Sequence, residues 1–143
     1  MNTIQDQLIQ QFQNMDNAYE AYARSRGLTY LSLMVLEEIF FLGDGCTQKQ
    51  ISEDTHYPKQ SVNLVIREFL EEGLLSLREL PENRKNKGIY LTESGRKRCQ
   101  EVVTPLWQLE DTVISELGAD DSRELLRLLE HYGEAYCRNL GEL

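Results

Sequence analysis

Proline, cysteine and histidine are scarce in this chain, with 3 Pro, 3 Cys and 2 His in 143 residues. Cys46, Cys99 and Cys137 are odd in number, widely spaced and without a Cys-x-x-Cys pair. This pattern argues against a disulfide framework and against a zinc ribbon. We therefore expect reduced thiols that pack as small apolar residues, with a redox-sensing thiol as the alternative.

Long apolar runs are also missing. No purely apolar run exceeds that of residues 39–42, which is far shorter than the roughly 20 residues of a membrane-spanning helix. Residues 1–20 lack the charged start and apolar stretch of a signal peptide. We expect a cytoplasmic protein with no membrane partner.

Signatures of catalysis are absent as well. Neither His56 nor His131 stands in a recognisable nucleophile, metal or phosphate motif, and there is no glycine-rich nucleotide loop. Cys46, His56 and His131 could form a metal-sensing site with acidic partners. We favour the alternative that both histidines are ordinary surface residues. We expect neither an enzyme nor a cofactor.

What the chain does contain is typical of one globular, helix-rich domain spanning residues 1–143, with 41% hydrophobic residues and 9 Gly. The net charge of -9 is unevenly distributed. Residues 44–100 hold ten Lys and Arg against nine Asp and Glu, whereas the remainder holds five against fifteen. The middle of the chain could therefore approach a polyanion that the two ends would repel.

Helical periodicity dominates both ends of the chain. The first helix should end near Gly27, and Thr29 should cap a second that stops at residues 43–45. Thr92 should cap a long helix kinked at Pro105, and residues 121–124 (DSRE) should form a capping box that opens the last helix. The apolar stripes of the first helix and the last two comprise Ile4, Leu8, Phe12, Met15, Tyr19 and Tyr22; Val102, Leu106, Leu109, Val113 and Leu117; and Leu125, Leu129, Tyr132, Tyr136 and Leu140.

A helix-turn-helix pattern occupies residues 47–73. Residues 47–50 (TQKQ) predict a capping box in which the Thr47 hydroxyl and the Gln50 amide bond each other's backbone N–H. The helix that follows should end near Thr55 and break at residues 56–58, and Pro58 should open a second helix ending at Gly73. A short helix, a tight turn and a longer helix are the outline of a DNA-binding module.

The longer helix, residues 59–72, presents two contrasting faces. Val62, Val65, Ile66 and Phe69 fall on one side and predict a buried face. The opposite face carries groups that can hydrogen-bond base edges or meet phosphates near the helix N-terminus. These are Lys59, Gln60, Ser61, Asn63 and Arg67, flanked by Leu64.

Two short stretches rich in strand formers, residues 74–80 and 88–91, follow this helix. Residues 81–87 between them are polar, so the segment predicts a β-hairpin with a long polar tip. The tip concentrates positive charge beside Asn83, in Arg84, Lys85 and Lys87. We expect this wing, residues 81–88, to lie on the DNA backbone or in the minor groove.

The run "TQKQISEDTHYPKQSVNLVIREFLEEGLLSLRELPENRKNKGIYLTESGR" resembles the winged helix-turn-helix of the multiple-antibiotic-resistance regulator (MarR) family, most specifically in "PKQSV" through "EEGLL" and in "YLTESG". The resemblance covers essentially the whole chain. It implies a mainly α fold with a small β-hairpin wing, in which residues 28–92 bind DNA and residues 1–27 and 93–143 form a helical dimerisation region.

By the same resemblance, the protein is a homodimer that binds a pseudo-palindromic operator in double-stranded DNA and represses transcription. A small phenolic or lipophilic effector, or oxidation of a cysteine, releases DNA in many such regulators. The predicted DNA-binding residues are Thr47, Gln48, Lys49, Lys59, Gln60, Ser61, Asn63, Arg67, Asn83, Arg84, Lys85 and Lys87.

The chain departs from the family pattern at two places. Asn83 and Lys85 stand where the family's wing carries Asp and Arg, so Arg84 or Lys85 would make the minor-groove contact. His56 stands where the turn usually has glycine, and histidine tolerates positive φ better than most residues.

Aromatic residues could line an effector pocket, but aromatic residues at helical spacing are more often part of the core. They are Tyr19, Tyr22, Tyr30, Tyr57, Trp107, Tyr132 and Tyr136.

The overall acidity and the altered wing also suit another class of protein, a winged-helix interaction adaptor or antirepressor that has lost operator binding.

Overall fold

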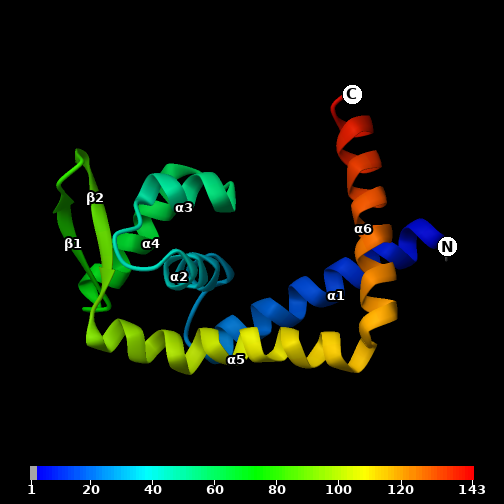
Figure 1. The fold of residues 1–143 in the computed structure, drawn as a ribbon, viewed down its shortest axis with the longest axis horizontal. Helices are drawn as coiled ribbons and strands as arrows, with labels where there is room; N and C mark the ends of the chain where they lie inside the picture. The colour runs from blue at the N-terminus through cyan, green and yellow to red at the C-terminus, as the bar shows by residue number, and fades with distance from the viewer. Residues whose placement is uncertain (1–2) are drawn as a thin grey trace. The chain divides into compact units, whose positions relative to one another are not determined.

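The computed structural model describes residues 3–143, without the side chains of Asn83 and Arg84. The described chain is mainly helical with one antiparallel hairpin (Figure 1), which confirms the predicted fold class. Its elements are α1 (Ile4–Ser25), α2 (Tyr30–Leu42), α3 (Gln48–Thr55), α4 (Lys59–Glu71), β1 (Leu75–Leu80), β2 (Asn83–Leu91), α5 (Glu93–Leu117) and α6 (Ala119–Leu140).

The chain forms two compact units, one up to Thr104 and one from Pro105 onward. The first holds α1 to α4, the hairpin and the first part of α5, and the second holds the remainder of α5 and α6. Within the described part of the chain, no helix is long and apolar enough to cross a membrane.

The core of the first unit is built from the apolar faces of its helices and the inner face of the hairpin. The predicted stripe of α4 is buried, with Phe69 only 1% exposed, and Thr29 caps α2 as expected. Each such side chain contributes on the order of 1.5–3 kcal/mol when it leaves water. The most deeply buried large side chains are those of Leu33, Val35, Leu36, Ile39, Ile51, Val62, Phe69, Ile89, Val102 and Val103.

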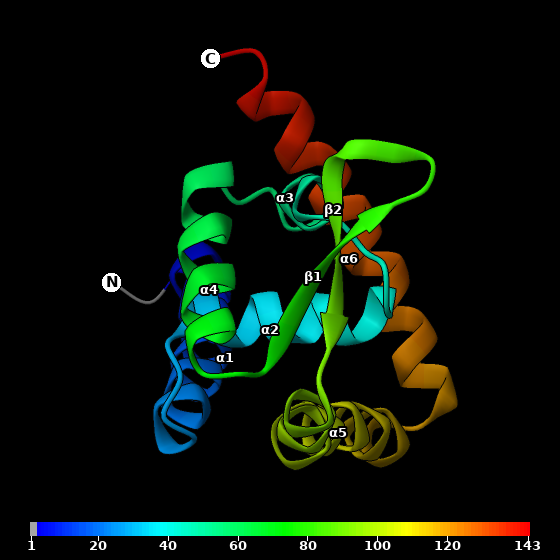
Figure 2. The ribbon, with the colours of Figure 1, turned by 90° about the vertical axis from the view of Figure 1, so that its left-hand side faces the viewer.

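The hairpin stands beside α4 in Figure 2, and its second strand is longer than the sequence predicted. The pairing runs from Leu75 opposite Leu91 to Glu79 opposite Lys87, and then shifts so that Leu80 faces Asn83. The predicted polar tip of residues 81–87 is therefore wrong, because only Pro81 and Glu82 form the turn. Backbone pairing does not require apolar side chains, and charged residues can occupy a strand whose faces meet solvent.

A third segment joins the hairpin. The N–H of Gly45 donates to the Ile89 carbonyl at 2.8 Å, and the N–H of Ile89 donates to the Cys46 carbonyl at 2.7 Å. The loop before α3 therefore pairs with β2 and ties the helix-turn-helix to the wing.

The start of α5 packs tightly under the hairpin. Thr92 caps the helix as predicted, because its hydroxyl accepts from the N–H of Gly95 at 3.0 Å. Gly95 is buried, and a Cβ at this position would lie 2.0 Å from the carbonyl oxygen of Leu74. The position therefore admits only glycine without a backbone shift. Pro105 lies inside α5, which continues to Leu117.

In the second unit, α6 begins three residues earlier than predicted. The helix starts at Ala119, directly after Gly118, whose φ of 86° is not helical. No side chain caps the start of the helix. The predicted capping box of residues 121–124 is wrong. Asp120 and Asp121 instead lie in the first turn, where the helix dipole favours negative charge.

Replacing Gly95 with alanine should lower the free energy of unfolding by about 2 kcal/mol or more, because backbone atoms of Leu74 must move. Chemical denaturation would measure the loss. The neighbouring exposed position provides the control, since Ser94→Ala should change stability by less than about 0.5 kcal/mol. Equal stability of the Gly95→Ala variant and the native chain would contradict the close packing described here.

Candidate nucleic-acid interface

The turn between α3 and α4 is fixed by the conformation and hydrogen bonds of its own residues. His56 adopts the left-handed conformation with φ of 59°, which histidine tolerates better than most residues. The Ser52 hydroxyl donates to the Tyr57 carbonyl, and the Thr55 hydroxyl to the Ile51 carbonyl, both at 2.6 Å. The capping box at the start of α3 is confirmed, since Thr47 and Gln50 exchange both of its hydrogen bonds.

Helix α4 leaves its N-terminal amides uncapped by any side chain. Pro58 is its N-cap and makes no side-chain hydrogen bond to the first turn. Gln60 and Arg67 are exposed on the side opposite the core, while Ser61 is half-buried. The helix ends as predicted at Gly73, which has φ of 74°, with the N–H of Leu74 donating to the Phe69 carbonyl.

Two amide side chains connect α3 to α4. The Nε2 of Gln48 donates to the Lys59 carbonyl at 3.1 Å, and the Nδ2 of Asn63 donates to the Oε1 of Gln48, also at 3.1 Å. Both side chains are half-buried. The first residue of α3 is thereby bonded to the first and second turns of α4.

A groove of about 560 Å³ lies between these helices and the wing. It brings together seven of the predicted DNA-binding residues: Gln48, Lys49, Lys59, Asn63, Arg67, Lys85 and Lys87. Five of the seven are cationic, and no Asp or Glu is among the residues that line the groove. Asn86 and four apolar side chains complete it, the latter being those of Ile66, Leu70, Leu77 and Ile89.

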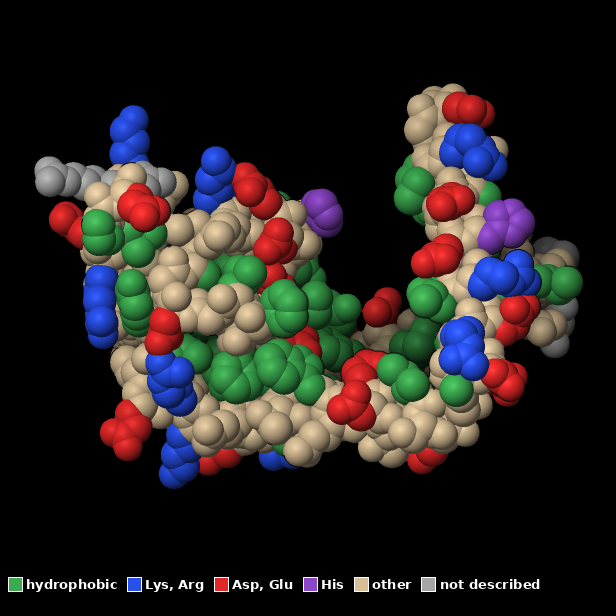
Figure 3. Space-filling view, in the orientation of Figure 1, with side chains coloured by type: hydrophobic (Ala, Val, Ile, Leu, Met, Phe, Trp, Pro, Cys, Tyr) green, Lys and Arg blue, Asp and Glu red, His purple; other side chains and the backbone are tan. Residues whose placement is uncertain are grey.

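The remaining predicted residues are placed differently. Thr47, Gln60 and Ser61 lie on α4 or at the start of α3 without lining the groove. The side chains of Asn83 and Arg84 fall outside the described residues. Basic side chains nevertheless project from the wing in Figure 3, and Lys85 and Lys87 are exposed.

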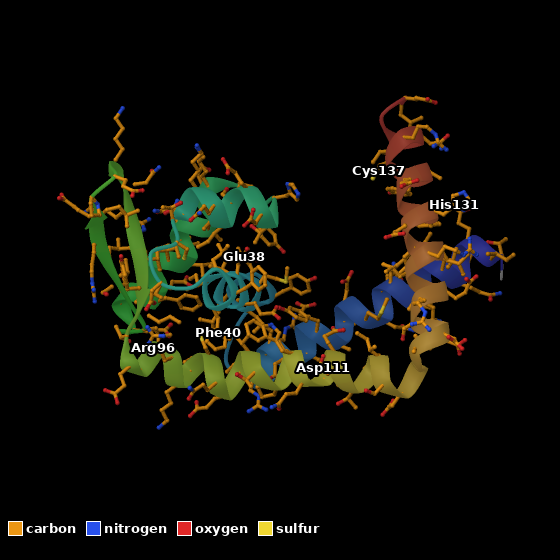
Figure 4. All side chains as sticks on the ribbon, viewed as in Figure 1. Glu38, Phe40, Arg96, Asp111, His131 and Cys137 are labelled. Atoms are coloured by element: carbon orange, nitrogen blue, oxygen red, sulfur yellow. The ribbon has the colours of Figure 1, made fainter. Side chains whose placement is uncertain are left out.

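The residues that support the wing were not predicted from the sequence. The Oδ1 of Asp44 accepts from the N–H of Leu91 at 3.2 Å, and its Oδ2 forms an ion pair with the Arg96 guanidinium. Figure 4 shows Arg96 at the base of the wing, where β2 passes into α5. On the hairpin itself, the Arg78 guanidinium lies over the Tyr90 ring, 4.4 Å from its centroid. No local pattern marks these pairs, because their members are far apart along the chain.

The tyrosines of the first unit make specific hydrogen bonds. Tyr19 donates to the Glu37 carboxylate at 2.7 Å, and Tyr22 donates to the Val102 carbonyl at the same distance. Burial and the Glu37 carboxylate raise the pKa of the Tyr19 phenol. Tyr19 also contacts Tyr30 edge to face, with ring centroids 4.9 Å apart. These contacts give the residues a structural role in joining α1 to α2 and α5.

The three thiols differ in exposure. Cys46 and Cys99 are buried, as expected of free cysteines, and Cys137 is exposed on α6. Burial, aided by the Asp44 carboxylate, raises the pKa of Cys46 to about 11. Burial raises the pKa of Cys99 to about 11 in spite of Arg96 and Arg98. Both buried thiols should therefore be mainly protonated at neutral pH and react slowly.

No protein-family model matches the chain. A curated protein, the HTH-type transcriptional regulator BilQ of Clostridium symbiosum, is 21% identical over 106 residues, which cover 73% of this chain and 74% of that protein.

Solved structures agree over nearly the full length. A MarR family regulator from Neisseria meningitidis superposes with a TM-score of 0.78 at 25% identity, covering 99% of both chains. The MepR–DNA complex of S. aureus superposes with a TM-score of 0.74 at 18% identity, covering 95% of this chain and 99% of that one. The resemblance to the MarR family inferred from the sequence is confirmed.

One thiol should react quickly in the native protein, and all three in denaturant. At pH 8 only about one in a thousand molecules of a thiol with a pKa near 11 is ionised, so Cys46 and Cys99 should react slowly. Titration with a chromogenic disulfide reagent would count the fast thiols, and Cys137→Ser should remove the fast phase. A second thiol that reacts as quickly at pH 8 would contradict the assignment.

Proposed function

We propose that this chain, which has the winged-helix fold of MarR family regulators, is a sequence-specific transcriptional regulator that binds double-stranded DNA. In this proposal α4 enters the major groove, and the wing lies on the phosphate backbone or in the minor groove. It acts in the cytoplasm as a homodimer on a pseudo-palindromic operator and represses transcription. A small phenolic or lipophilic compound is the class of effector that would release it.

The groove between α4 and the wing is the observation that supports DNA binding most strongly. It gathers five Lys and Arg residues and no carboxylate in a protein whose net charge is -9. The uncapped amides at the start of α4 add partial positive charge where a phosphate would lie. MepR, a structural relative, is described in complex with DNA.

The exposed apolar face of α6 supports a homodimer. None of its residues is buried within the chain, and green side chains are visible along it in Figure 3. Apolar surface of this extent usually marks an interface. A two-fold axis would bury the face against its own copy and set two reading helices about 34 Å apart, one turn of DNA. The exposed side chains are those of Leu125, Leu126, Leu128, Leu129, Tyr132, Tyr136 and Leu140.

A second candidate function is an interaction adaptor without operator binding. The acidity of the chain outside residues 44–100 and the wing's departure from the family pattern favour it. The carboxylate-free lining of the groove favours DNA instead.

Arg67→Ala should weaken binding to promoter fragments of the source genome by about 1–3 kcal/mol, because Arg67 is exposed on α4 and lines the groove. The double variant Lys85→Ala with Lys87→Ala should lower affinity for all fragments. It should also reduce the slope of log affinity against log salt concentration by the equivalent of about two phosphate contacts. Gel-shift titrations at several salt concentrations would measure both effects.

Lys97→Ala is the matched control, since Lys97 is exposed on α5 and does not line the groove. It should leave affinity unchanged. If the native protein shifts no promoter fragment even at low salt, the adaptor replaces the regulator as the proposed function.

A further inference from the structure

The amide pair formed by Gln48 and Asn63 has a defined orientation. The Lys59 carbonyl can only accept, so the atom of Gln48 that faces it must be the donor Nε2. This places Oε1 of Gln48 toward Asn63, and the atom of Asn63 that meets an acceptor must be Nδ2. One backbone carbonyl therefore sets the orientation of both amides.

This orientation leaves part of the hydrogen-bonding capacity of Asn63 outside the pair. Nδ2 carries two hydrogens, and Gln48 accepts only one of them. Oδ1 and one N–H therefore remain for another partner, and an Asn amide can contact adenine with an oxygen that accepts from the N6 amino group and an N–H that donates to N7 in the major groove. Asn63 also lines the groove between α4 and the wing.

From this geometry we infer that Gln48 is a positioning residue that holds Asn63 to read an adenine in each half of the operator. The inference rests on the proposed function and deepens it by naming the base and the side chain that reads it. Locking a side chain before binding removes the conformational entropy that would otherwise oppose the contact. Without Gln48, the Asn63 amide could rotate and form hydrogen bonds with other bases.

The experiment selects bound duplexes from a library of random double-stranded DNA and reads the base preference at each position of the recovered site. The native protein should enrich an A·T pair at one position in each half-site. Asn63→Ala should lower that preference by roughly tenfold, within the range of a good bidentate contact, and leave other positions unchanged. In Asn63→Asp the new carboxylate can only accept hydrogen bonds. The base preference at that position should therefore move toward cytosine, whose N4 amino group is a donor.

Gln48→Leu has a similar shape but makes neither hydrogen bond. It should reduce the adenine preference at the same position while the rest of the site is retained. A role in folding alone would weaken binding to all sequences equally, so a change confined to one base separates positioning from stability. Thermal unfolding of each variant checks its fold, and Asn63→Asp, which is nearly isosteric, tests the reading independently of Gln48→Leu.

Gln100→Ala serves as the matched control, since Gln100 is an exposed amide on α5 outside the groove and its variant should keep the native preference. Unchanged preference in Asn63→Ala would overturn the reading of adenine by Asn63. A loss in Asn63→Ala with none in Gln48→Leu would overturn the positioning role of Gln48. If the native protein enriches no duplex at all, the proposed function itself fails, and the inference fails with it.

Discussion

The hydroxyl of Thr92 joins three elements on which the interface depends. It donates to the Gly73 carbonyl at 2.7 Å and accepts from the N–H of Gly95, while the backbone N–H of Thr92 donates to the Leu74 carbonyl. The end of α4, the start of β1 and the first turn of α5 therefore meet around one side chain. Since β2 leads directly into Thr92, this junction sets where the wing stands relative to α4, and the groove between them follows from it.

Local charge within the groove matters more for its chemistry than the net charge of the chain. Over most of the surface, acidic residues disfavour a polyanion, and at 0.15 M salt their effect fades within about 8 Å. Within the groove, Lys49 has Glu53 at 3.8 Å along α3, but the lining itself contains no carboxylate. A polyanion that enters the groove therefore meets cations and amides, and the acidity elsewhere discourages binding in other orientations.

Most of the features predicted correctly from the sequence depend on neighbouring residues, and most of those missed depend on distant ones. The capping box at Thr47, the turn at His56 and the buried face of α4 follow from local patterns, and the structure contains all three. The length of β2 was missed because strand pairing can extend through Lys85 and Lys87 without any change in composition. The start of α6 was mispredicted although the signal is local: Gly118, with a φ of 86°, directly precedes the helix, and no side chain caps it. The pairing of Asp44 with Arg96 and that of Gln48 with Asn63 depend on tertiary folding, which brings together residues without a shared motif.

Directional contacts hold the turn between α3 and α4 in addition to the apolar packing of the two helices. Ser52 donates from its side chain to the Tyr57 carbonyl in the turn and Gln48 to the Lys59 carbonyl beside it, while Thr55 donates to the Ile51 carbonyl within α3. Apolar packing tolerates small sliding motions, whereas a hydrogen bond weakens steeply once its angle changes. The two helices should therefore behave as one rigid body, and much of the ordering that an encounter would otherwise require is complete before the partner arrives. Docking of such a rigid surface should be limited by collision and orientation, so its association rate should respond to ionic strength more than to temperature-dependent rearrangement of the turn.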